Sequence, residues 1–206
     1  MKPITIIQGS MAPLRRSNVD TDQIMPKQFL KRVDRTGYGE FLFHDWRRAE
    51  PDFVLNRPEY RQASVLVTGP NFGSGSSREH APWGLQDWGF EAILAPSFAE
   101  IFFNNCTKIG LLPVVLTEKE IEWLLELAEA DSTAEIVVDL VSQTVTAADS
   151  GSSQEPSFEA RFQIDAYTKW RLQNGFDDIE LTLRHVDDIA RFEQDRPGYF
   201  PVLNRS

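Results

Sequence analysis

The segment GPNFGSGSSREHA, from Gly69 to Ala81, holds the residues best suited to chemistry. It follows a β-rich run and leads into a helical stretch, so its backbone N–H groups and the helix dipole can attract an anion. Ser76, Ser77 and Arg78 add two hydroxyls and a planar cation suited to bidentate carboxylate binding. The segment therefore predicts a site for a dicarboxylate or tricarboxylate.

Two nucleotide-binding motifs do not explain this loop. A P-loop ends in Gly-Lys-Ser/Thr, and a dinucleotide fingerprint needs a third glycine where this chain has Arg78. A structural alternative stays open, because Ser76 and Glu79 have the spacing of a capping box. Pro82 would then fall beyond the first helical turn, where proline is costly.

Composition limits the class of protein. The chain has 206 residues, 41% of them hydrophobic, with fourteen Phe and five Trp, which is enough apolar surface for a folded core. A net charge of −10 without a Lys/Arg run argues against binding nucleic acid or an anionic membrane. No apolar run is long enough for a signal peptide or a membrane span, so we expect an acidic cytoplasmic protein.

Cysteine and histidine usage predicts no metal site on this chain. Cys106 is the single cysteine, so it can form neither an intrachain disulfide nor a thiolate cage, and we expect it to be packed in the core. His44, His80 and His185 are widely spaced and show no zinc-binding pattern. Any cluster held by several thiolates must therefore belong to another chain.

The elements that must position the loop follow an α/β pattern from residue 63. Strand-like runs at 63–68, 91–95 and 111–116 each precede a helical stretch, which predicts parallel strands with crossover helices. Two of these helices have capping boxes, Ser97 with Glu100 and Thr117 with Glu120.

The two ends of the chain do not follow this α/β sequence pattern. Segments 135–148 and 158–164 look like antiparallel strands around a flexible tract at 147–157, and helical pieces are predicted near 165–174 and 186–194. The first sixty residues have weak periodicity and suggest irregular loops. We therefore expect one domain spanning residues 1–206, with a mostly parallel core, added antiparallel strands and a helical tail.

A family resemblance adds to this interpretation. NFGSGSSREHA resembles the serine loop of the aconitase superfamily, and the likeness continues through AILAPSFAEIFFNNCTKIGLLPVVL. NVDTDQIMPKQFLKRVDRTGYGEFLFHDWR and IDAYTKWRLQNGFDDIELTLRH resemble the small-subunit family of bacterial 3-isopropylmalate dehydratases. Nearly the whole chain is covered.

The resemblance implies a swivelling β/β/α domain, like the mobile C-terminal domain of aconitase. Such a domain closes over a large subunit that carries a [4Fe–4S] cluster, and the hydro-lyase is active only with that partner. The implied reaction is the isomerisation of 2-isopropylmalate and 3-isopropylmalate through 2-isopropylmaleate, in leucine biosynthesis. A related acid, of the citraconate, homoaconitate or dimethylmalate type, remains an alternative substrate. A non-catalytic anion-binding module is a third hypothesis.

The resemblance also implies roles for residues of the loop. Ser76 matches the base that removes a carbon-bound proton. Ser77 and Arg78 match positions that hold the substrate carboxylate and stabilise the serine oxyanion, and Gly75 lets the backbone approach the substrate. These roles suit the chemistry, because a serine alkoxide is a strong base that needs nearby donors to form.

Residues outside the loop complete the predicted site. Asp22 matches an active-site aspartate that could orient Arg78, although a turn or cap would also explain it. The specificity segment, which we expect to accept the isopropyl group, comprises Phe29, Leu30 and Lys31; a core role for Leu30 is the alternative.

Three further residues keep open roles. His80 adjoins the serine loop, but we interpret it as structural rather than as a general acid. Arg47 and Arg48 could contact a partner or substrate, or belong to a solvated loop.

Overall fold

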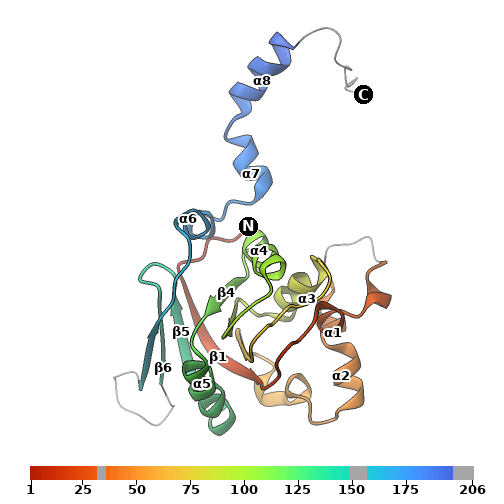
Figure 1. Cartoon of the computed structure of the whole chain (residues 1–206), viewed down its shortest axis with the longest axis vertical. Helices are drawn as coiled ribbons and strands as arrows, with labels where there is room; N and C mark the ends of the chain where they lie inside the picture. Colours follow the sequence, from red (N-terminus) through yellow and green to blue (C-terminus); the bar gives the residue numbers. More distant parts are fainter. Residues whose placement is uncertain (32–35, 149–156, 197–206) are drawn as a thin grey trace.

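A computed structural model describes residues 1–31, 36–148 and 157–196. Within these residues one sheet has the strand order β4-β3-β2-β1-β5-β6-β7 (Figure 1). The strands are β1 (Ile6–Leu14), β2 (Val65–Thr68), β3 (Ala92–Ala95), β4 (Leu112–Val115), β5 (Glu135–Asp139), β6 (Thr144–Ala148) and β7 (Phe158–Arg161). Strands β1 to β4 pair in parallel, and β5 to β7 extend the other side of β1 in antiparallel pairs. The predicted α/β class is confirmed.

Strand β1 joins the two halves of the sheet. Its residues 6–10 pair with β5 and its residues 11–14 pair with β2. The expectation of irregular loops in the first sixty residues is therefore wrong for this strand. Gly9, Ser10 and Pro13 interrupt its apolar pattern, so neither alternation nor a continuous apolar run marks it in the sequence. Long-range pairing decided its structure.

The three predicted crossover helices cover both faces of the sheet. They are α3 (His80–Trp88), α4 (Glu100–Ile109) and α5 (Glu118–Ala130). In β2, Val65 and Val67 belong to the core cluster that contains the buried side of α5, whereas Leu66 belongs to the cluster of α3 and α4. The loop from β2 to α3 thus starts at the carboxyl end of a parallel strand, where α/β proteins bind ligands.

One of the two predicted capping boxes is wrong. Thr117 and Glu120 form the expected capping box of α5. Helix α4, however, begins at Glu100 after Ala99, with no side-chain cap. The Ser97 hydroxyl instead accepts a hydrogen bond from the Asn71 N–H at 2.9 Å. It therefore ties the turn after β3 to the serine loop.

Short helical turns make up much of the described chain between β1 and β2. They are α1 (Thr21–Ile24), α2 (His44–Ala49) and the 3-10 turns Lys27–Phe29, Gly39–Phe41, Val54–Asn56 and Pro58–Tyr60. Their apolar side chains join the cluster of α3 and α4. Gly84 permits this contact, because a Cβ there would lie 2.4 Å from Met25 Cε. These short helical turns are therefore packed against α3.

The C-terminal part leaves the sheet as helices. Segment 135–148 forms the antiparallel pair β5 and β6, while most of the predicted flexible tract lies outside the described residues. Predicted helix α6 (Ala166–Asn174) ends at Gly175, and α7 (Asp178–Leu183), which was not predicted, precedes the predicted α8 (Val186–Asp195). Helices α7 and α8 extend away from the body, beyond α4 and the N-terminus (Figure 1). No helix in the described ranges is long and apolar enough to cross a bilayer.

Candidate active site

The serine loop, residues 69–79, lies along the segment that follows β1. The Gly73 N–H donates to Val19 O at 2.8 Å, and the Thr21 N–H donates to Ser74 O at 2.8 Å. Gly73 also permits close packing, because a Cβ there would overlap the Phe102 ring. The N-terminal segment, distant in sequence, therefore holds the loop in place.

Gly75 turns the chain before the two serines of the motif. Its φ of +92° lies in the left-handed region that favours glycine. The next residue is held by the Thr21 hydroxyl, which donates to Ser76 O at 2.9 Å. Ser76 and Ser77 are both exposed. Sequence analysis missed Thr21, whose only signal was its place between Asp20 and Asp22.

Arg78 and Asp22 are brought together from separate segments. The guanidinium Nη1 of Arg78 donates to Oδ1 of Asp22, as an ion pair. The Arg78 side chain is 19% exposed, whereas that of Asp22 is 50% exposed. Asp20, not Asp22, caps α1 through the Gln23 N–H. The carboxylate of Asp22 is therefore bound to Arg78 and does not cap the helix.

The capping-box alternative for Ser76 is wrong. Helix α3 begins at His80, with Glu79 in the cap position and no side chain bound to the end of the helix. Pro82 consequently falls within the first turn, where proline is tolerated. Ser76 lies outside the helix, and its exposed side chain has no capping role.

The predicted specificity residues lie on the same segment as Asp22. Phe29 and Leu30 are half-buried against the α3 and α4 cluster, and the Phe29 ring stacks on Phe41 with centroids 4.1 Å apart. Lys31 is exposed, and the described residues break after it. The contact with Phe41 is enough to explain why Phe29 is half-buried. The role of this segment in substrate specificity therefore remains a prediction.

His80 packs between aromatic rings. Its ring centroid lies 5.2 Å from Tyr38 and 4.8 Å from Trp83. Burial lowers the pKa of His80 below its ordinary value. The neutral imidazole is therefore favoured, which supports the structural interpretation.

The two neighbouring arginines differ in environment. Arg47 donates to the carbonyl oxygen of Glu40 at 3.2 Å and lies 4.7 Å from the centroid of the Trp88 ring. Arg48 is exposed. Arg47 therefore has a structural explanation within the chain, and Arg48 stays available to other molecules.

The donor set of the chain does not fit an iron–sulfur cluster. Cys106 is fully buried in α4, and burial raises the pKa of its thiol, so it has neither the exposure nor the charge of a metal ligand. Protein-bound clusters are held by several thiolates, and this sequence has one cysteine. In the part of the chain that the structure describes, no three His, Cys, Asp or Glu side chains group as metal ligands.

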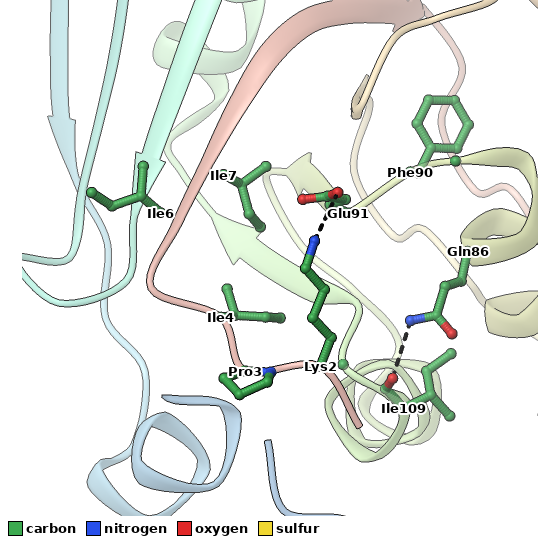
Figure 2. Close-up of a pocket in the computed structure, with 11 residues that line it drawn as sticks. Lys2, Pro3, Ile4, Ile6, Ile7, Gln86, Phe90, Glu91 and Ile109 are labelled. Carbon is green, nitrogen blue, oxygen red and sulfur yellow. Dashed lines mark hydrogen bonds and ion pairs between the residues drawn. The ribbon is translucent and has the colours of Figure 1, made fainter. Parts of the chain in front are cut away.

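A cavity of about 240 Å³ lies beside the N-terminal segment (Figure 2). Lys2 reaches Glu91 at 3.8 Å across it, and the Gln86 amide donates to Ile109 O at 3.1 Å. None of the predicted site residues lines this cavity. A second cavity, of about 290 Å³, adjoins the base of the serine loop at Gly69, but Arg15 on its wall is already paired with two glutamates. The predicted site is an open surface outside both.

Known proteins are similar to this chain in sequence and in fold. Residues 1–119 match the aconitase C-terminal domain, the class that the mixed sheet and its serine loop define. A 3-isopropylmalate dehydratase small subunit of Rubrobacter xylanophilus is 52% identical over 98% of both chains, and one of Thermobifida fusca is 54% identical over 98% of this chain and 99% of its own. Residues 178–206 match the C-terminal domain of such small subunits. The chain therefore belongs to the 3-isopropylmalate dehydratase small-subunit family.

A solved structure supports the fold. A 3-isopropylmalate dehydratase from Methanocaldococcus jannaschii aligns with a TM-score of 0.62, covering 90% of this chain and 99% of its own. The two sequences are 23% identical, so this likeness concerns the fold alone.

Proposed function

We propose that this chain, joined to a large subunit, interconverts 2-isopropylmalate and 3-isopropylmalate by removing and re-adding water. The observation that carries the proposal is the exposed Ser76 beside an Arg78 that Asp22 holds. Relatives at 52% and 54% identity are named 3-isopropylmalate dehydratase small subunit. The name of the family and the lone cysteine both support a partner that supplies the rest of the site.

Ser76 is the proposed base. The C–H beside a carboxylate is a weak acid, so its removal needs a strong and well-aimed base, which a serine alkoxide provides. The alkoxide forms only where donors stabilise it, and Arg78 with the loop N–H groups supplies them. Ser77 and Arg78 bind a substrate carboxylate, Gly75 lets the backbone approach it, and Asp22 keeps the guanidinium in place.

The large subunit would complete the site. Loss of hydroxide from carbon needs a Lewis acid, and the donor set of this chain does not hold one. We assign that part to a [4Fe–4S] cluster on the partner. The partner would also cover the exposed loop, because an alkoxide open to bulk water would be protonated. Phe29, Leu30 and Lys31 would contact the isopropyl group at the edge of the covered space.

The test uses the chain coexpressed with its large subunit. Ser76→Ala should lower kcat for 2-isopropylmalate by at least about 10³-fold while assembly persists. Ser74→Ala is the matched control on the same loop and should keep near-normal turnover. Near-normal turnover of Ser76→Ala would show that Ser76 is not the base.

Substrate and partner are tested in the same preparation. Wild-type complex should turn over isopropylmalates faster than citraconate, homoaconitate or dimethylmalate, and a reversed order would identify one of the related hydro-lyases. The chain alone should show neither hydratase activity nor iron–sulfur absorbance. Tight diacid binding by the chain alone, with no turnover in the complex, would favour the anion-binding module.

A further inference from the structure

Thr21 contacts the serine loop on both sides of Gly75. Its backbone N–H donates to Ser74 O at 2.8 Å, and its hydroxyl donates to Ser76 O at 2.9 Å. The residue is 2% exposed, and its own carbonyl accepts the Met25 N–H at 2.9 Å within the turn of α1. Thr21 is therefore a buried, hydrogen-bonded residue that anchors residues 74–76 of the loop.

The hydroxyl bond orients the peptide between Ser76 and Ser77. A trans peptide is planar, with its carbonyl and its N–H on opposite sides. With the Ser76 carbonyl held toward the buried Thr21, the Ser77 N–H faces away from Thr21. Gly75 restrains the neighbouring backbone little by itself, because glycine has access to many conformations. The Thr21 hydroxyl thus makes the direct contact that sets the direction of this N–H donor.

We infer that Thr21 is a positioning residue of the proposed reaction. Its hydroxyl fixes the Ser76–Ser77 peptide so that the Ser77 N–H stabilises negative charge on the Ser76 oxygen or on a substrate carboxylate. The adjacent Asp22 holds Arg78, so one turn of α1 sets both the backbone donor and the cationic donor of the site. This inference rests on the proposed function.

The test compares three variants in the reconstituted complex. Thr21→Val keeps the shape but loses the donor, and it should lower kcat by about 10- to 100-fold with a much smaller change in KM. The rise of its activity with pH should be shifted to higher pH than in wild type, because a less stabilised Ser76 ionises at higher pH. Thr21→Ser restores the hydroxyl and should recover most of kcat.

Thr107→Val is the matched control. Thr107 is also buried, at 6% exposure, and its hydroxyl also donates to a backbone carbonyl, that of Asn104 at 2.9 Å, but it lies in α4. This variant should lose similar stability and keep kcat. Unchanged kcat in Thr21→Val, an equal loss in Thr107→Val, or no recovery in Thr21→Ser would each overturn the inference.

A second measurement separates this inference from the proposed function. In the chain alone, ¹⁵N relaxation should show lower backbone order at residues 75–77 in Thr21→Val and no such change in Thr107→Val. Equal order in Thr21→Val and wild type would overturn the positioning role whatever the reaction. A wild-type complex that turned over none of the acids would instead refute the proposed function, and with it the catalytic part of the inference.

Discussion

Arg78 binds the carboxylate of Asp22 although the two residues come from different parts of the fold, the loop after β2 and the first turn of α1. The ion pair uses one N–H of the Arg78 guanidinium. The remaining N–H groups can donate to a second carboxylate. The Arg78 side chain is mostly covered and cannot reorient freely. Arg78 is therefore a preformed cationic donor two residues after Ser76 in the chain.

The Asp22–Arg78 pair should matter more for activity than for stability. Asp22 is half-exposed, so Asp22→Asn should change the free energy of unfolding by less than about 1 kcal/mol. In the complex it should lower kcat/KM by about 10- to 100-fold, because the guanidinium loses its fixed position. Urea unfolding and steady-state kinetics measure the two effects.

Glu59→Gln is the control for this variant. It breaks an exposed ion pair of 2.7 Å to Arg57, which lies outside the predicted site. This substitution should change neither the free energy of unfolding nor kcat/KM appreciably. A loss of activity in Asp22→Asn no larger than in Glu59→Gln would remove Asp22 from the site.

Leu30 should affect the choice of substrate. Leu30→Ala removes apolar surface, and it should lower kcat/KM for isopropylmalate by about tenfold while changing turnover of a methyl-substituted analogue less. The ratio of the two kcat/KM values is the measurement. Leu127→Ala, in the other core cluster, is the control and should leave this ratio unchanged. Equal losses for both acids, with lowered stability, would assign Leu30 to the core.

Gly73 should tolerate no side chain. Gly73→Ala combines a left-handed φ of +76° with a Cβ 2.1 Å from the Phe102 ring, so it should lower the free energy of unfolding by about 2–5 kcal/mol. Gly110→Ala, at a left-handed φ of +83° where the nearest atom to the Cβ is Sδ of the flexible Met1 side chain at 3.3 Å, should cost only about 1–2 kcal/mol. Urea unfolding measures the loss of unfolding free energy in each variant, and the difference between the two losses is the cost of the clash with Phe102. Equal losses would show that Phe102 moves aside.

His80 should make folding sensitive to mild acid. Its folded-state pKa is depressed by burial, so the unfolded chain binds the proton more readily. The contribution to stability is therefore complete above the unfolded pKa and is lost as pH falls from about 6.5 toward the folded value. Urea unfolding at pH 7.5 and 5.5 should show a smaller pH effect in His80→Gln than in wild type. His185→Gln, at a side chain 70% exposed, should leave the wild-type effect intact.

Local sequence patterns predicted the crossover helices correctly. They were wrong for the Ser97 cap and for strand β1, and both errors have a physical cause. Thr117 and Glu120 interact within one helical turn, so their spacing was sufficient to predict the cap. Ser97 had the same spacing, but its hydroxyl binds Asn71 on another loop, and tertiary contact outweighed the local pattern. Strand β1 carries a glycine and a proline that local rules penalise, and pairing on both sides compensates for them.

By itself the sequence determined the chemistry available: two serines and an arginine on a glycine-rich loop, a single cysteine, and apolar runs that must form buried strands. Only the tertiary structure decided that Thr21 contacts Ser76 and that Asp22 binds Arg78. The physical reason is the parallel pairing of β1 with β2, which brings the carboxyl ends of two strands to one edge of the sheet. Such pairing depends on the whole core, so no local pattern along the chain could specify it.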